Sequence, residues 1–184
     1  QRIAALDPAR RARGVVVVMH QMGSHGPAYY RRSPPAFKKF MPECASNVLQ
    51  DCPREQLVNA YDNTILYTDH LLASTVQWLE RTGREKPVDT AMVYVSDHGE
   101  SLGENNLYLH GLPYALAPQF QIHVPMLTWL SASMQARTGV RTECLQKQAA
   151  APLTHDNLFH SMLGLLDINT GVYQPGLDLF STCR

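Results

Sequence analysis

The feature that most constrains the fold of this chain is a long apolar stripe in its first half. The apolar positions recur at steps of three or four residues, which keeps them on one face of an α-helix for about six turns. The sequence Asp51-Cys52-Pro53 marks the expected start of this helix, and Gly83 marks its expected end. The stripe consists of Leu57, Tyr61, Ile65, Thr68, Leu72, Val76 and Leu79.

Apolar runs on both sides of this helix predict β-strands. Residues 15–19 read Val-Val-Val-Val-Met, residues 90–95 read Thr-Ala-Met-Val-Tyr-Val, and residues 124–130 form a third run. A continuous apolar run is typical of a strand that is covered on both faces. Pro125 near the start of the third run is compatible with a strand entrance or edge.

A second helix is predicted near the carboxyl end of the chain. Thr154 is a good N-cap residue for it. We expect this helix to bury Leu158, Phe159, Met162, Leu163 and Leu166.

The order strand, long helix, strand, loop, strand, helix predicts an α/β sandwich with a mainly parallel sheet flanked by helices. A chain of 184 residues can bury one substantial core, so a single domain is expected. The chain lacks an initiator Met, which indicates a fragment or a processed chain.

Composition narrows the possible functions. An apolar fraction of 45% and a charged fraction of 17% are typical of a folded domain, and no run of eighteen apolar residues predicts a membrane span. Residues 1–54 hold nine Lys and Arg against three Asp and Glu. One basic group either lies on a solvated surface or attracts an anionic substrate. This basic group consists of Arg31, Arg32, Lys38 and Lys39. Basic and aromatic residues do not interleave in the manner of a nucleic-acid-binding surface, so no nucleic-acid partner is expected.

The four cysteines leave two interpretations open. Cys44 and Cys52 bracket a short polar loop, where a disulfide would restrict the chain and would fit an oxidising compartment. The alternative is four free, buried thiols. No C-x-x-C pair occurs, which argues against a structural zinc knuckle or a redox motif.

The strongest chemical motif is Ser96-Asp97-His98-Gly99-Glu100, directly after the run at 90–95. A carboxylate and an imidazole at the end of a strand suit zinc or manganese better than calcium. Neighbouring side chains of a strand point to opposite faces, so both can reach one ion only if the chain bends, and Gly99 permits such a bend. A surface turn is the alternative.

Other histidines compete for roles at the same sheet edge. His25 follows the run at 15–19 in a loop of Gly and Pro, where it either caps its own loop or serves as a general acid near a metal ion. His110 is a further candidate ligand, and Glu100 a supporting carboxylate. Because open α/β sheets place ligands past the carboxyl ends of strands, we expect these groups to converge. No ligands are expected among His70, His123, His155 and His160.

Four motifs together resemble the lipid A phosphoethanolamine transferases, which include the mobile colistin-resistance enzymes. These motifs are Gly23-Ser24-His25-Gly26-Pro27-Ala28-Tyr29-Tyr30, Tyr61-Asp62-Asn63-Thr64, the segment from Ser96 to Asn105, and Tyr108-Leu109-His110-Gly111. The resemblance extends from about residue 15 to residue 184.

The resemblance implies a sulfatase-like fold of the alkaline phosphatase superfamily, at the periplasmic face of the bacterial inner membrane. It implies a Zn2+-dependent transfer of phosphoethanolamine from phosphatidylethanolamine to a lipid A phosphate through a phosphothreonine. Asp97 and His98 match zinc ligands of the family, whereas His25 and His110 match histidines around the phosphoryl group or a second zinc ion. Glu100 matches an acidic neighbour. The resemblance also implies a Cys44–Cys52 disulfide, and a Cys144–Cys183 pair is possible.

The chain departs from the family in what it lacks. The membrane helices, the glutamate ligand and the nucleophilic threonine of the family have no counterpart here, since Thr64 and Thr68 fall on the long helix. Residues 1–184 are therefore expected to form the carboxyl-terminal part of one catalytic domain, inactive without its amino-terminal half. The alternatives are another sulfatase-superfamily phosphodiesterase or phosphoglycerol transferase, or a non-catalytic fragment.

Overall fold

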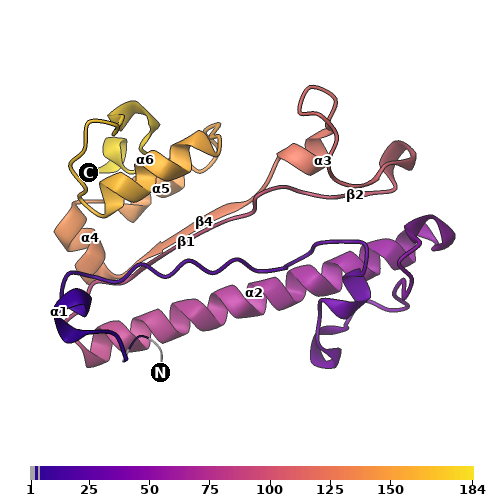
Figure 1. Cartoon of the computed structure of the whole chain (residues 1–184), viewed down its shortest axis with the longest axis horizontal. Helices are drawn as coiled ribbons and strands as arrows, with labels where there is room; N and C mark the ends of the chain where they lie inside the picture. Colours follow the sequence, from indigo (N-terminus) through magenta and orange to yellow (C-terminus); the bar gives the residue numbers. More distant parts are fainter. Residues whose placement is uncertain (1–2, 4) are drawn as a thin grey trace.

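The computed structural model describes residues 3 and 5–184, and its dominant element is the helix α2, Arg54–Glu85 (Figure 1). The helix predicted from the apolar stripe is thus confirmed, and it begins directly after Pro53. It runs past the predicted end at Gly83, because nothing there breaks the helix before Lys86, whose backbone is extended (φ −138°, ψ 145°). A proline disfavours the helical conformation of the residue before it. Because Pro87 follows Lys86, the helix ends before Lys86.

The amino-terminal half of α2 carries the buried face of this helix. Its buried residues are Leu57, Ala60, Asn63 and Thr64. Farther along, the predicted stripe is only partly buried, and Ile65 is 45% exposed. Among the described residues, no helix is both long and apolar enough to cross a bilayer.

The strands β1, Ala91–Val95, and β4, Met126–Leu130, lie where the sequence predicts strands. They pair antiparallel, with Val95 opposite Met126, so the predicted parallel arrangement is wrong for this pair. The excursion over residues 96–125 leaves the carboxyl end of β1 and returns to the start of β4 at the same edge, which requires antiparallel pairing. The candidate site residues after β1 lie in this excursion.

The strand predicted at residues 15–19 does not form. Its backbone forms no backbone hydrogen bond to any described residue, and no described strand pairs with it. A β-branched run suits a pleated surface only where a neighbouring strand pairs with its backbone. Its side chains are accordingly exposed: Val15 by 40%, Val16 by 57%, Val17 by 56%, Val18 by 89% and Met19 by 63%.

Shorter elements complete the fold (Figure 1). A small antiparallel hairpin joins β2, Ser101–Leu102, and β3, Tyr108–Leu109. The remaining α-helices are α1, Pro8–Arg11; α3, Gln119–Ile122; α4, Ala132–Thr138; α5, Thr142–Lys147; and α6, Asp156–Leu165. Single 3-10 turns are η1, Tyr29–Arg31; η2, Pro35–Phe37; η3, Leu49–Asp51; η4, Glu104–Asn106; η5, Pro175–Leu177; and η6, Ser181–Cys183.

The helix α6 confirms the predicted position of the last helix but not its buried face. The N-cap residue of α6 is His155 rather than the predicted Thr154, whose hydroxyl still accepts a hydrogen bond from Asp156 N at 3.3 Å. Phe159, predicted to be buried, is 54% exposed, whereas His160 and Ser161 are buried. Nδ1 of His160 and Oγ of Ser161 accept backbone N–H groups of the carboxyl-terminal segment, so these hydrogen bonds select the polar face.

Two small cores stabilise the two ends of the molecule. One surrounds the start of α2 and contains Tyr29, Cys44, Leu49, Leu57 and Ala60. The other contains Leu130, Met134, Val140, Leu165 and Phe180. A disulfide lies at each core, Cys44–Cys52 at the first and Cys144–Cys183 at the second, which confirms both pairings.

Candidate metal centre

The turn after β1 presents Asp97 and His98. Ser96 N donates to Pro125 O and the Ser96 hydroxyl donates to His98 O at 2.8 Å, which fixes the chain as it leaves the strand. Gly99 is needed for close approach rather than for a left-handed bend: a Cβ there would lie 2.0 Å from the backbone oxygen of Phe120. Gly99 therefore lets the turn pack tightly against the segment of α3. This role differs from the bend that the sequence predicts.

The β2–β3 hairpin presents His110. Its loop needs left-handed backbone at Gly103 (φ 96°), Asn105 (φ 52°) and Asn106 (φ 61°), residue types that adopt this region more readily than most. Leu109 directly before His110 is also left-handed, with φ 64°. A leucine rarely adopts this conformation, so the surrounding contacts hold the backbone that aims His110.

The loop after residues 15–19 presents His25. The Thr64 hydroxyl on α2 donates to Tyr61 O and accepts from the Ser24 hydroxyl at 2.7 Å, and Nε of Arg32 donates to His25 O at 3.1 Å. Gly26 N donates to Oε1 of Glu100 at 3.1 Å. The loop is therefore anchored to α2 on one side and to the segment after β1 on the other.

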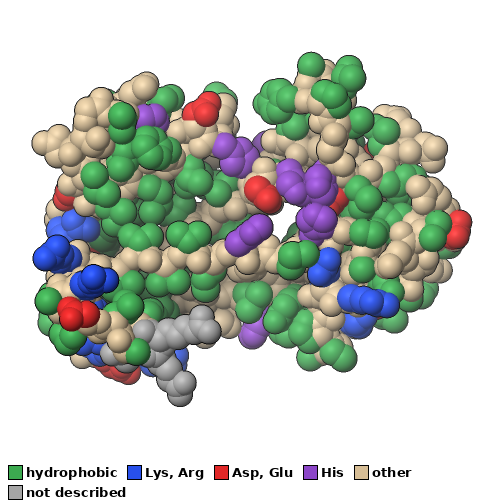
Figure 2. All heavy atoms as spheres, viewed as in Figure 1, with side chains coloured by type: hydrophobic (Ala, Val, Ile, Leu, Met, Phe, Trp, Pro, Cys, Tyr) green, Lys and Arg blue, Asp and Glu red, His purple; other side chains and the backbone are tan. Residues whose placement is uncertain are grey.

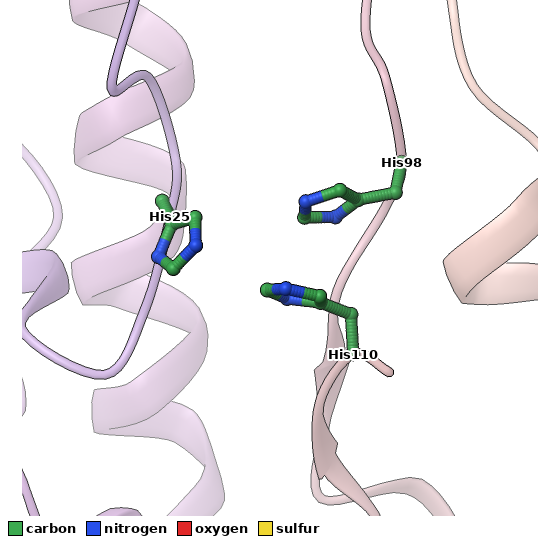
Figure 3. Close-up of side chains that lie close together, drawn as sticks. All are labelled: His25, His98 and His110. Atoms are coloured by element: carbon green, nitrogen blue, oxygen red, sulfur yellow. The ribbon is translucent and has the colours of Figure 1, made fainter. Parts of the chain in front are cut away.

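The three imidazoles converge (Figure 3). The rings of His98 and His110 stack with centroids 3.8 Å apart, and the His25 ring stands edge-on at 5.0 Å from His110 and 6.0 Å from His98. One nitrogen of each residue lies within 4.8 Å of the others, so the group could hold a metal ion. Figure 2 shows histidine side chains gathered at the middle of the face it displays.

Nδ1 of each of the three histidines lies near an oxygen atom. Nδ1 of His25 lies 2.6 Å from Gly26 O, and Nδ1 of His98 lies 3.0 Å from Gly99 O. A carbonyl oxygen only accepts, so in both residues Nδ1 carries the proton. Nδ1 of His110 lies 3.3 Å from Oε1 of Glu100. Nε2 of each ring is then left to face the cluster, as in metal-binding histidines whose other nitrogen is held by an oxygen acceptor.

The two carboxylates at the site differ in exposure. The Asp97 side chain is 73% exposed, and its Oδ2 lies 3.9 Å from Nε2 of His98. The Glu100 side chain is only 3% exposed and joins the His25 loop to His110. Burial, followed by the charge of Glu100, raises the pKa values of both Tyr29 and Tyr61, which lie beneath the cluster. Glu100 is therefore enclosed within the protein, whereas Asp97 faces outward.

The structure also assigns contacts that the sequence did not reveal. The ring of His155 lies outside the metal group, but its Nε2 donates to Ser96 O at 2.9 Å and joins α6 to the turn after β1. In the basic group, Nζ of Lys38 donates to Tyr30 O, and Nε of Arg31 donates to the Tyr30 hydroxyl. Because Arg32 donates a hydrogen bond to His25 O, three of the four basic side chains form hydrogen bonds to residues of their own loop.

The motif Tyr61-Asp62-Asn63-Thr64 has a structural role on α2. Oδ1 of Asn63 accepts N–H groups from Lys39 and Phe40, and its Nδ2 donates to Phe40 O and Glu43. Thr64 holds Ser24. The helical periodicity of the sequence could have revealed the role of Asn63. A polar residue on the buried face of a helix needs hydrogen-bond partners.

Comparison with known proteins identifies the family. The family described as Sulfatase matches residues 4–168. The chain belongs to the sulfatase family. The α/β, sulfatase-like fold class expected from the sequence is thereby confirmed, apart from the strand directions corrected above.

The most informative relatives are phosphoethanolamine transferases. Over 170 residues the chain is 51% identical to phosphoethanolamine transferase EptA of Salmonella typhimurium, covering 92% of this chain and 31% of the relative. It is 42% identical to phosphatidylethanolamine transferase Mcr-1 of Escherichia coli over 160 residues, which is 87% of this chain and 28% of the relative. The chain thus spans about a third of the length of these curated relatives, and the expected resemblance is confirmed.

A solved structure shares the fold. The soluble domain of lipooligosaccharide phosphoethanolamine transferase A from Neisseria meningitidis superposes with a TM-score of 0.85 at 43% identity. The match covers 90% of this chain and 49% of that domain. The arrangement described here therefore corresponds to about half of a domain of that fold.

Proposed function

We propose that this chain forms the carboxyl-terminal part, residues 1–184, of the single catalytic domain of a zinc-dependent phosphoethanolamine transferase. The whole protein would take phosphoethanolamine from phosphatidylethanolamine and pass it to a lipid A phosphate through a phosphothreonine. The nucleophilic threonine and a glutamate ligand would come from the amino-terminal half of the domain. The identity of 51% to EptA and 42% to Mcr-1 supports this reaction class.

The observation that carries the proposal is the shared pattern of His25, His98 and His110. Nδ1 of His25 and Nδ1 of His98 are held by backbone oxygens, and Nδ1 of His110 lies 3.3 Å from Oε1 of Glu100. Three imidazole nitrogens within 4.8 Å of one another, with a carboxylate beside them, suit a borderline divalent cation such as Zn2+. The donor set therefore fits the cofactor that the family resemblance implies.

Asp97 and His98 would hold the zinc ion, whereas His25 and His110 would contact the phosphoryl group or hold a second ion. Zinc bound there would lower the pKa of an attacking hydroxyl and would neutralise charge on the phosphoryl oxygens. The Gly26 and Gly99 carbonyls keep Nε2 of His25 and His98 aimed at the site. Glu100 does the same for His110 from a buried position.

The transfer breaks the bond between phosphorus and the glycerol oxygen of the donor lipid, and it forms a bond to the threonine oxygen. The glycerol oxygen must then gain a proton. We assign its delivery to an imidazole of the cluster that holds no metal ion, and His25 is the first candidate, because its ring is exposed at the rim of the cluster. In the second step the phosphoethanolamine group would pass to a phosphate oxygen of lipid A, the bond between phosphorus and the threonine oxygen would break, and the threonine oxygen would regain a proton.

We infer that the domain works at the periplasmic face of the bacterial inner membrane, attached through helices outside this chain. Two disulfides fit an oxidising compartment. The chain also resembles the carboxyl-terminal periplasmic domain of phosphoethanolamine transferase EptC from Campylobacter jejuni, with a TM-score of 0.77 and 44% identity.

The test is product analysis with the whole protein that contains this chain. Vesicles of lipid A with either phosphatidylethanolamine or phosphatidylglycerol are incubated with the protein and zinc, and modified lipid A, diacylglycerol and free phosphoethanolamine are measured by mass spectrometry. Asp97→Ala should abolish the product, whereas His123→Ala, outside the metal group, should leave it unchanged.

Each other outcome identifies a different activity. Diacylglycerol and free phosphoethanolamine without modified lipid A would indicate a phosphodiesterase. Transfer only from phosphatidylglycerol would indicate a phosphoglycerol transferase, and no turnover of either lipid would indicate a non-catalytic fold. Equal activity of the wild type and Asp97→Ala would reject Asp97 as a metal ligand.

A further inference from the structure

Two buried polar atoms beside the metal centre have no hydrogen-bond partner among the described residues. They are the hydroxyl of Tyr29 and Oε2 of Glu100. Tyr29 is 1% exposed, and the Glu100 side chain is 3% exposed. A buried carboxylate oxygen without a donor is costly. A phenol can donate and a carboxylate can accept, so the two atoms are chemically complementary.

Both groups lie against the same backbone residue, Gly26. Its N–H donates to Oε1 of Glu100 at 3.1 Å. A Cβ added to Gly26 would lie 2.7 Å from the hydroxyl oxygen of Tyr29, so that oxygen occupies the space a side chain would need. The Tyr29 hydroxyl and the Glu100 carboxylate thus meet in one small volume beneath the His25 loop.

The phenol of Tyr29 is well fixed and stays a donor. The residue lies in η1 (Tyr29–Arg31), is part of the core at the start of α2, and stands edge-on to Tyr61 with ring centroids 5.6 Å apart. Burial, followed by the charge of Glu100, raises the pKa of Tyr29. The hydroxyl therefore keeps its proton at neutral pH.

We propose that Tyr29 is a positioning residue whose hydroxyl donates to Oε2 of Glu100 and thereby fixes the carboxylate that orients His110 and the His25 loop. Oε1 of Glu100 already serves Gly26 N and lies beside Nδ1 of His110. With a donor on the second oxygen, the carboxylate plane cannot rotate. The tyrosine is buried, so it acts through Glu100 and does not touch the substrate. The inference rests on the proposed function, because it assumes that the cluster binds zinc.

The first test is Tyr29→Phe in the whole protein, which keeps the packed ring and removes only the hydroxyl. Zinc affinity, measured by calorimetry, should weaken about ten-fold, the lower range for the loss of a group supporting a metal-binding histidine. The kcat value should fall by a similar factor, with KM changed less than about two-fold. Tyr108→Phe is the matched control, since Tyr108 packs on the same core, and it should match the wild type in all three values.

A double-mutant cycle separates positioning from packing. If Tyr29 acts through Glu100, the variant Tyr29→Phe/Glu100→Gln should bind zinc no more weakly than Glu100→Gln alone. Losses that multiply, or a Tyr29→Phe protein indistinguishable from Tyr108→Phe, would overturn the proposal. Zinc binding needs no turnover. A protein that depends on Tyr29 for zinc but transfers nothing would support this inference and reject the proposed function.

A crystal structure of the whole wild-type protein gives a test that needs no variant. The Tyr29 and Glu100 oxygens should lie about 2.5–2.7 Å apart, as for a hydroxyl bonded to a carboxylate. A donor from another segment on Oε2, with the Tyr29 hydroxyl turned away, would contradict the proposal.

Discussion

Nδ1 of His110 lies 3.3 Å from Oε1 of Glu100, a carboxylate whose side chain is 3% exposed. The same oxygen accepts the N–H of Gly26, the residue after His25. One buried carboxylate therefore joins two histidine-bearing segments that are 84 residues apart in sequence, by the numbers of Gly26 and His110. This connection places a buried carboxylate between the segments that form the candidate metal centre.

Substitution of Glu100 should expose this dependence. Glu100→Gln keeps the size of the side chain but removes its charge, so we expect zinc affinity to weaken about 10- to 100-fold. Calorimetric zinc titration of the whole protein checks this, with Glu80→Gln on the exposed surface of α2 as the control. Unchanged affinity in Glu100→Gln would mean that His110 is oriented by something else.

Removal of each imidazole should weaken the same site. His25→Ala, His98→Ala and His110→Ala should each lower zinc affinity at least about ten-fold, because each removes a nitrogen from the group within 4.8 Å. His123→Ala removes an exposed imidazole outside the group and should bind zinc like the wild type. If one of the three variants also bound normally, that histidine would be assigned to the substrate rather than to the metal.

Gly99 should tolerate no side chain. In Gly99→Ala the new Cβ would meet the backbone oxygen of Phe120 at 2.0 Å, so the turn carrying His98 or the segment of α3 must move. We expect a loss of about 1–3 kcal/mol in the free energy of unfolding, the range for overpacking. Gly171→Ala has no atom within 4 Å of the added Cβ and should stay within about 0.5 kcal/mol of the wild type. Urea unfolding measures both.

Alkaline pH should weaken the fold through Tyr29. Burial and the charge of Glu100 raise its pKa in the folded state above the ordinary value of 10.0. Above pH 10 the unfolded chain therefore loses the phenolic proton that the folded protein keeps. The contribution of Tyr29 to the free energy of unfolding is therefore complete below pH 10. Above pH 10 this contribution falls by about 1.4 kcal/mol per pH unit. Urea unfolding between pH 8 and about 11 should show a shallower decline for Tyr29→Phe, and identical slopes would argue against this burial.

The two disulfides should contribute unequally to stability. Cys144–Cys183 spans a sequence separation of 39, and Cys44–Cys52 spans 8. By the chain-entropy estimate, loss of the first costs about 4 kcal/mol and loss of the second about 2.5 kcal/mol. Urea unfolding of the two paired Cys→Ser variants measures this. A larger loss for the Cys44/Cys52 variant would show that contacts in the first core, rather than loop entropy, dominate.

The sequence by itself determined the elements that depend on local spacing. The apolar stripe predicts α2, and the apolar runs before Asp97 and after Val124 predict β1 and β4, because periodicity and β-branching act between near neighbours. The four motifs shared with known enzymes also indicated the family. The apolar run at 90–95 placed Asp97 and His98 directly after a strand. These predictions needed no knowledge of which segments pack together.

The tertiary structure alone decided how distant segments use these elements. The run at 15–19 reads as a strand, yet it lacks a described partner, and α6 buries His160 and Ser161 because another segment bonds to them. Glu100 became a buried connector, and the three imidazoles came together, because the excursion over residues 96–125 packs against the loop that carries His25. Hydrogen bonds between residues far apart in sequence leave no local periodicity, so the sequence could not reveal them.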